Sequence, residues 1–261
     1  MPVGEERIVL YKKRFPRLIL RTFGTMKLHA HLRLRPMLDW AGKRFVGQGT
    51  LRVLEVGCGE GLNLFALARR FDIRGEGYDL DPNHVAICQR LADARFPGQF
   101  RFVEADATAQ LGLNDSFDVI LLMDFLEHVP NPESVVAHCE PYLKRGGVML
   151  VSVPTTRYPR VFGWAMHRRI GHLVDGYDLE DLLKLFPPRM RCIHYRYNTG
   201  IPAQVGCFLQ FRVVSRLPNE GLRWLATIPL MAFRLTDWWN SPSLSCSLFA
   251  VFEKAAEDQQ S

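Results

Sequence analysis

The most constraining feature of the sequence is a glycine-rich loop set between an apolar run and a helix-forming run. Residues 51–56 read LRVLEV, which is typical of a short buried strand, and residues 57–61 read GCGEG. Residues 62–71 are rich in Leu and Ala and predict a helix. A strand, a tight glycine loop and a helix in this order predict a βαβ unit whose loop backbone comes close to a ligand.

Strand and helix signals continue to alternate along the chain. Strands are predicted at residues 74–78, 100–104, 117–122 and 148–153, and two more at 191–197 and 245–252. Helices are predicted after Asp81-Pro82 and after Asn131-Pro132, where the first residue caps the helix and proline takes its first position. The second of these helices is expected to end at Gly146-Gly147. This alternation predicts an α/β fold, a mostly parallel sheet with helices on both faces.

The composition is that of an ordinary globular protein, but the charge is unevenly distributed. Of 261 residues, 48% are hydrophobic and 23% charged, which excludes a disordered or fibrous chain. Residues 1–50 hold 11 of the 33 Lys and Arg but only 3 acids, so the net charge of +6 resides in this N-terminal arm. The sequence shows no signal peptide and no long apolar run, which predicts a cytoplasmic protein. Six scattered cysteines predict free thiols.

We expect residues 1–48 to form a basic amphipathic extension, with short helices broken at Pro16 and Pro36. Residues 49–261 would then form the main domain, with insertions at about 155–176 and 199–243. Both insertions and the arm combine aromatic or apolar with basic residues, which suits an apolar ligand under a lid or an anionic membrane surface. The same aromatic residues would equally serve to cover an open edge of the sheet.

Acidic residues follow the predicted strands. Glu55 and Asp79 end the first two strands, and Asp106 and Asp124 follow the next two. The carboxyl ends of parallel strands share one edge of a sheet, and ligands bind there. Carboxylates disfavour the pyrophosphate of NAD or FAD and favour the ammonium and sulfonium of S-adenosylmethionine. In this interpretation Asp79 accepts hydrogen bonds from ribose hydroxyls, and Asp106 accepts one from the adenine amino group or instead caps a turn.

Five segments in this order and spacing resemble the class I S-adenosylmethionine-dependent methyltransferases: VLEVGCGEG, YDLDP, EADA, FDVILLMDFLEHV and LKRGGVMLVSVP. The resemblance covers residues 50–155, and 172–186 more loosely, and is greatest to the small-molecule branch that includes ubiquinone-pathway O-methyltransferases. It implies a Rossmann-like sheet of seven strands, the last antiparallel. It also implies S-adenosylmethionine as cofactor, with a set of cofactor-binding residues: Glu55, Gly57, Cys58, Gly59, Gly61, Asp79, Leu80, Asp106, Ala107, Met123 and Asp124.

Candidate catalytic residues are expected near that edge. Transfer of a methyl group to a hydroxyl requires a base, and His is the usual base near neutral pH. His172 and His128 are the leading candidates, with Tyr177 as an orienting hydroxyl. His128 has an alternative role in fixing the loop after the fourth strand. A metal site formed by Glu127, His128 and His172 is conceivable, but nothing in their spacing requires one, and we predict no metal.

The sequence therefore predicts a methyltransferase that acts on a small, largely apolar acceptor, with O-methylation first and N- or C-methylation open. One alternative is a nucleic-acid methyltransferase that uses the basic arm. The turn Met123-Asp124-Phe125-Leu126 differs from the [Asn/Asp]-Pro-Pro-[Tyr/Phe] turn of the amino-directed enzymes of that kind. A second alternative is a catalytically silent partner subunit that binds the cofactor. The oligomeric state is open.

Overall fold

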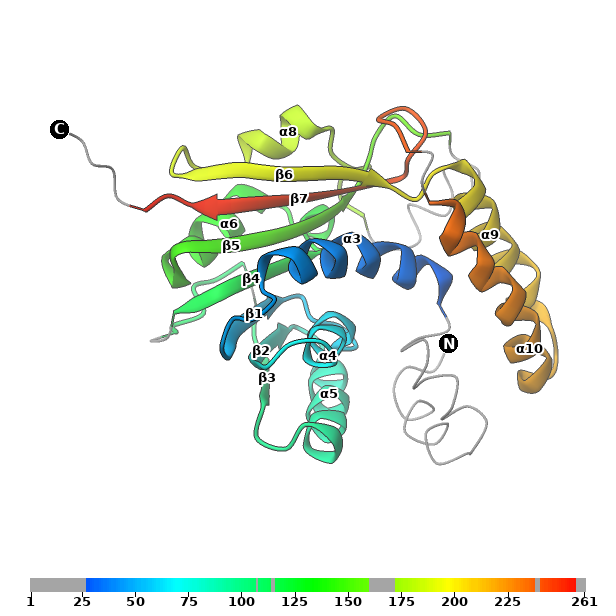
Figure 1. Ribbon diagram of the computed structural model, residues 1–261, viewed down its shortest axis with the longest axis horizontal. Coiled ribbons are helices and arrows are strands. Elements are labelled where there is room, and N and C mark those ends of the chain that lie inside the picture. The colour runs from blue at the N-terminus through cyan, green and yellow to red at the C-terminus, as the bar shows by residue number, and fades with distance from the viewer. Residues whose placement is uncertain (1–26, 107, 114–115, 160–171, 238–239, 257–261) are drawn as a thin grey trace.

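The computed structural model describes residues 27–106, 108–113, 116–159, 172–237 and 240–256. Among them, seven strands form one sheet in the order β3-β2-β1-β4-β5-β7-β6 (Figure 1). Their bounds are β1 Leu51–Val56, β2 Ile73–Asp79, β3 Phe100–Glu104, β4 Phe117–Met123, β5 Leu143–Pro154, β6 Met190–Asn198 and β7 Ser247–Lys254. The first five strands pair in parallel, and β7 is antiparallel to both β5 and β6. The predicted seven-stranded α/β fold with an antiparallel last strand is confirmed.

Helices cover both faces of the sheet. On one face lie α3 Leu28–Arg44, α4 Leu62–Ala68 and α5 Pro82–Arg95, and on the other lie α6 Pro132–Cys139 and α8 Leu179–Lys184 (Figure 1). Alternate residues of the central strands point into two separate hydrophobic cores, one on each face of the sheet. Leu121 is buried on the face of α3, α4 and α5, and Ile120 on the face of α6 and α8. Asp81 and Asn131 cap α5 and α6 as predicted, by accepting from backbone amides in the first turn.

The helix α6 is shorter than the sequence predicts. It ends at Cys139, a 3-10 turn covers Glu140–Tyr142, and Leu143 already begins β5 instead of lying on the helix. Pro141 explains the early end, because it has no amide to continue the helical hydrogen bonds. Gly146 and Gly147 then lie inside β5, where the register shifts against β4.

The predicted break at Pro36 is wrong, because α3 runs through this residue. A proline inside a helix leaves the carbonyl four residues earlier without its usual donor, and here that carbonyl belongs to Leu32. The buried side chain of Asn198, at the end of β6, donates to the Leu32 carbonyl at 3.2 Å. A tertiary hydrogen bond therefore replaces the helical one. Pro16 lies outside the described residues.

The helix α3 is built into the body of the protein. Met37 and Ala41 belong to the core on its face of the sheet, and Leu28 and Leu32 are fully buried. The division of the chain at residue 48 stays a prediction, but part of the expected extension is thus a structural element of the sheet domain. The rest of the arm, like residues 160–171 of the first insertion, lies outside the described residues.

The second insertion is largely helical. Between β6 and β7 the chain forms α9 Ile201–Arg212 and α10 Glu220–Leu230, with 3-10 turns at Val214–Arg216 and Met231–Thr236. The helix α9 packs on α3 through Ala203 and Cys207, while α10 extends to the far side of the hairpin, away from the sheet (Figure 1). Within the described part of the chain, every helix is too short or too polar to cross a membrane. All six cysteines are free, as predicted.

We expect the replacement Asn198→Ala to reveal the hydrogen bond that allows Pro36 in α3. The change should lower the free energy of unfolding by about 1–3 kcal/mol, because the buried carbonyl of Leu32 loses its donor. Urea denaturation of Asn198→Ala, Pro36→Ala and the double variant measures this. Since Pro36→Ala restores a helical amide, the loss from Asn198→Ala should shrink in that background. Equal losses in both backgrounds would contradict this account.

Candidate active site

The glycine loop after β1 is held in the left-handed backbone region. Gly57, Gly59 and Gly61 have φ values of +70°, +48° and +67°, which side chains other than glycine rarely adopt. At Gly57 a Cβ atom would lie 2.2 Å from the ring of Phe125, so packing also requires glycine there. At Gly59 a Cβ atom would meet nothing within 4 Å. The loop is therefore packed on one side and open at Gly59, as a backbone cradle for a ligand must be.

Asp79 lies at the end of β2 and binds this loop. Its carboxylate accepts hydrogen bonds from the backbone amides of Gly59 at 2.7 Å and Asp81 at 3.0 Å. The next residue, Leu80, is 69% exposed, which is unusual for a leucine beside a strand end. An anchored carboxylate with an exposed apolar neighbour suits a ribose and an adenine ring. The proposed roles of Asp79 and Leu80 stay predictions.

Glu55 lies beneath the loop and is 1% exposed. Its Oε1 atom accepts from Nδ2 of Asn63 at 2.5 Å, and the carboxylate also accepts from the backbone amide of Leu64. It therefore satisfies the first turn of α4, which Gly61, with no side chain, cannot cap. Burial raises the pKa of Glu55 to about 8, and the charge of Asp79 adds to this shift. A bound cation would favour the ionised form of this carboxyl group.

Other predicted cofactor residues contribute in different ways. Cys58 and Met123 are 4% and 7% exposed, so they present mainly backbone. A hydrogen bond with Cys88, together with burial, raises the pKa of the Cys58 thiol, so a reactive thiolate is disfavoured. Asp106 is exposed and accepts from the amide and hydroxyl of Thr108 at 2.8 and 2.7 Å, which matches its alternative role in a turn. Ala107 lies outside the described residues.

Asp124 follows β4 and is the centre of an ion pair that the sequence did not predict. Its backbone is left-handed, with φ of +52°, and its Oδ1 atom accepts from Ser152 Oγ at 3.1 Å. Nη1 of Arg33, on α3, lies 2.5 Å from Asp124 Oδ2. Burial raises the pKa of Asp124, and the Arg33 guanidinium opposes that shift. A charge run alone gives no indication of which arginine pairs with which acid.

A second ion pair joins α3 to the glycine loop. Nζ of Lys27, the residue before α3, lies 3.0 Å from Oε1 of Glu60, an acid of the glycine loop. With the Arg33 pair, α3 contacts the site at the loop after β1 and at the turn after β4. The expected anionic partner of these two basic residues is thus the protein itself.

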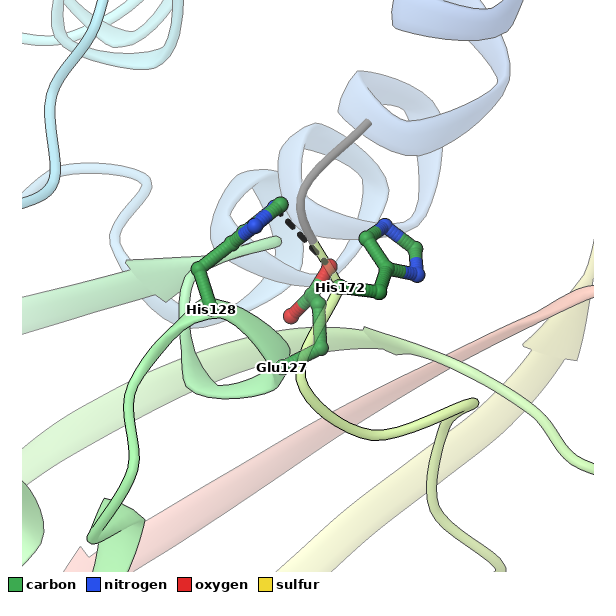
Figure 2. Close-up of side chains that lie close together, drawn as sticks. All are labelled: Glu127, His128 and His172. Carbon is green, nitrogen blue, oxygen red and sulfur yellow. Dashed lines mark ion pairs between the residues drawn. The ribbon is translucent and has the colours of Figure 1, made fainter. Parts of the chain in front are cut away.

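The two predicted histidines lie together with a buried carboxyl group (Figure 2). The rings of His128 and His172 are 4.9 Å apart in an edge-to-face arrangement, with an interplanar angle of 81°. Nε2 of His128 lies 4.0 Å from Oε1 of Glu127. The backbone amide of Leu173 donates to the Glu127 carbonyl at 2.8 Å and so holds the segment after residue 171 against the turn after β4.

Glu127 is the most unusual member of this cluster. Its side chain is buried, and no other described residue donates a hydrogen bond to either carboxyl oxygen. Burial, and then the charge of Asp124, raise the pKa of Glu127 to about 8, while Arg33 acts in the opposite direction. A carboxyl group that titrates near neutral pH beside two imidazoles suits proton transfer.

The same cluster has a second chemical capacity. One ligand atom from each of Glu127, His128 and His172 lies within 4.8 Å of the others, so the three could also hold a divalent cation. The sequence predicts no metal. Whether the three residues bind a divalent cation is therefore a question for experiment.

Tyr177 is 7% exposed and lies close enough to Glu127 to feel its charge. Its hydroxyl donates to the carbonyl of Leu126 at 3.1 Å. Burial, and then the charge of Glu127, raise the pKa of Tyr177 to about 12, so its hydroxyl keeps its proton. The hydrogen bond to Leu126 anchors the turn that carries Glu127 and His128. The role of Tyr177 as an orienting hydroxyl for the acceptor stays a prediction.

Comparison with known proteins agrees with this geometry. A family model described as a methyltransferase domain matches residues 11–187. The ubiquinone biosynthesis O-methyltransferase of Xanthomonas campestris pv. campestris (strain B100) is 37% identical over 144 residues, 53% of this chain and 56% of that protein. The match spans about half the length of the curated relatives.

Solved structures share the fold. The cyclase SpnF has a TM-score of 0.60 at 19% identity and covers 85% of this chain and 82% of its own. Coclaurine N-methyltransferase, bound to N-methylheliamine and SAH, has a TM-score of 0.59 at 14% identity and covers 84% of this chain and 72% of its own. Since these two proteins are named for different reactions, the likeness indicates the fold alone.

The replacement Glu127→Gln tests the raised pKa of this carboxyl group. An ordinary Glu ionises near pH 4.5, whereas Glu127 ionises near pH 8 in the folded chain, so between these values the folded state holds a proton that the unfolded state has lost. Wild-type stability should therefore fall as the pH rises through this window. Gln does not titrate, so the variant should gain roughly 3 to 4 kcal/mol over wild type between pH 5 and pH 8.

Urea unfolding of both proteins at pH 5, 6, 7 and 8 measures this difference. Glu133→Gln, at an exposed position on α6, is the control and should follow wild type. Parallel pH profiles of Glu127→Gln and wild type would show that Glu127 titrates normally.

Proposed function

The chain belongs to the family of methyltransferase domains, and from this membership we propose that it transfers a methyl group from S-adenosylmethionine to a hydroxyl of a small, largely apolar molecule. The observation that carries the cofactor assignment is the open, left-handed Gly59 held by the Asp79 carboxylate. The curated relatives, which are O-methyltransferases of ubiquinone biosynthesis, support the acceptor class.

The residues at the carboxyl edge of the sheet fit such a cofactor. Asp79 would accept from the ribose hydroxyls, and Leu80 would cover one face of the adenine. Glu55, in β1, and Asp124, after β4, lie near the strand ends where the methionine part would bind, and its ammonium group would favour the ionised form of Glu55. When bound, the cofactor supplies an electrophilic methyl group on a sulfonium. Gly57, Gly59 and Gly61 would allow the close approach of backbone that this ligand needs.

The chain's own residues must bind the acceptor and remove its proton. A neutral imidazole of His172 or His128 would accept the proton of the acceptor hydroxyl. In its ionised form Glu127, whose pKa is about 8, would take this proton from the imidazolium. Tyr177 and the amide of Leu173 would hold the two segments that carry the histidines. The reaction then depends mainly on alignment of the acceptor oxygen with the methyl group.

An apolar acceptor would be found mainly in membranes, so its character is relevant to the location of the protein in the cell. Basic residues of the arm and the helices α9 and α10 support contact with an anionic membrane surface, where an apolar acceptor would dissolve. A cytoplasmic protein that binds such a surface peripherally is the form we propose. The nucleic-acid alternative gains no support from the turn Met123-Asp124-Phe125-Leu126, and the silent-partner alternative gains none from the curated relatives.

The replacement Asp79→Asn tests the cofactor site. Removing the charge while preserving the shape should weaken S-adenosylmethionine binding tenfold or more, because an amide cannot accept with both atoms as a carboxylate does. Isothermal titration calorimetry measures the affinity. Asp93→Asn, on the exposed side of α5, is the matched control and should bind like wild type. Equal affinity in both variants would leave Asp79 without its proposed role.

The replacement His172→Asn tests the base. We expect transfer of labelled methyl from S-adenosylmethionine into an organic-extractable acceptor from a lipid extract to fall by about 10²-fold or more, with cofactor affinity unchanged. His128→Asn shows whether one imidazole or the pair is required. His138→Asn, on α6, is the control.

Metal chelation separates the two capacities of the cluster. If His172 acts as a base, EDTA should leave the rate unchanged, and the wild-type pH profile should lose its acidic limb in His172→Asn. Loss of activity in EDTA that an added divalent cation reverses would assign the cluster to metal binding instead.

A further inference from the structure

The outward face of α10 is apolar. Leu222, Leu225 and Ile228 lie three residues apart on one side of this helix and are 50%, 56% and 40% exposed. Gly221 and Pro229, on the same side, are exposed as well. Among the residues whose side chains the structure describes, this face carries no charged side chain. We call Leu222, Leu225 and Ile228 the α10 patch.

The buried side of α10 is formed by residues other than those of the α10 patch. Thr227, 5% exposed, lies on that side, and its hydroxyl donates to the Arg223 carbonyl at 2.8 Å. Met231, just past the helix, is 3% exposed and packs with Leu28 of α3. A helix of a globular protein normally buries its leucines and exposes its threonine. The reversed pattern indicates that the α10 patch is kept for something outside the chain.

Basic residues are frequent in the segment that carries this patch. Between residues 201 and 236 the sequence holds four arginines, at 212, 216, 223 and 234, and a single acid, Glu220. Arg212 and Arg216 are exposed at the turn between α9 and α10. Three more apolar side chains of the hairpin, Phe211, Val213 and Leu235, are 40%, 53% and 67% exposed. Exposed leucines within an arginine-rich segment match an interfacial helix on an anionic bilayer.

We propose that the α10 patch docks the protein on an anionic membrane surface. The helix of 11 residues is about 16 Å long, too short to span a bilayer but long enough to lie in its interface. Charge favours lipid over the other occupants. Residues 1–26 hold six basic and two acidic residues, and a second hairpin would bring its own arginines, so both would be repelled.

The docked hairpin would lie one helix away from the candidate active site. Ala203 and Cys207 of α9 pack on Leu28 and Leu32 of α3, and Arg33 of α3 pairs with Asp124. An acceptor dissolved in the bilayer would therefore reach the site from the side on which α10 is anchored. In this respect the inference rests on the proposed function, but docking itself does not require catalysis.

Co-sedimentation with phosphatidylcholine vesicles, with and without 30 mol% phosphatidylglycerol, tests the proposal. The full chain should bind the anionic vesicles more tightly. The triple variant Leu222→Gln, Leu225→Gln, Ile228→Gln should lower the partition constant at least tenfold. A control triple, Val46→Gln, Leu183→Gln and Ile193→Gln, changes equally exposed apolar residues elsewhere and should remain within twofold of wild type. Arg212→Gln with Arg216→Gln should lower binding about fivefold for each charge removed, and only on anionic vesicles.

Unchanged binding of the patch variant, or no binding by wild type to either vesicle, would overturn the proposal. So would a wild-type dimer in sedimentation equilibrium that the patch variant dissociates, because the occupant would then be a second copy. Circular dichroism must show that each variant is folded. Methyl transfer in detergent micelles keeps the two proposals apart, since the patch variant should retain wild-type transfer there. If wild type transfers no methyl group in micelles yet binds vesicles, only the proposed function fails.

Discussion

Compensation of negative charge at one edge of the sheet is the constraint on which the site depends. Parallel strands place Glu55, Asp79 and Asp124 at neighbouring carboxyl ends, and burial makes the ionised forms of Glu55 and Asp124 unfavourable. Arg33 of α3 supplies the cation for Asp124, backbone amides satisfy Asp79, and Glu55 accepts from the first turn of α4. Each of the three acids thus has a different kind of partner. In the loop between them, a Cβ atom at Gly59 would meet nothing within 4 Å, so this position is open to a ligand.

Much of the structure at the carboxyl ends of the strands could be predicted from sequence, because it depends on residues that are close together in the chain. The Asx-Pro pairs at Asp81 and Asn131 cap helices through contacts within four residues. Strand ends follow from apolar runs, and parallel pairing then brings acids together without any further information. From the sequence, a meeting of His128 and His172 is only conceivable, as part of a metal site with Glu127, since their contact depends on how residues 172–177 return across the turn after β4.

The errors arise where distant residues decide local structure. Pro36 lies within α3 because Asn198, 162 positions later in the sequence, donates to the carbonyl that proline leaves without a donor. The charge of the arm predicts an external anionic partner, whereas Arg33 pairs with Asp124 inside the protein. A sequence gives charge and hydropathy but no partner for a long-range contact. The end of α6 differs, because Pro141 is a local signal in the sequence and by itself predicts the shorter helix.

The position of the α9–α10 insertion in the sheet has a consequence for how such proteins diversify. Asn198 ends β6 opposite Ser247, which begins β7, and Ser247 lies opposite Pro154 at the carboxyl end of β5. The insertion therefore leaves and re-enters the sheet at one point on the ligand-binding edge, and crosses neither core. The outer helix α10 can change in length and surface while α9 keeps its contact with α3. New surface chemistry can in this way be added to the scaffold through one helix that holds no residue of the candidate site.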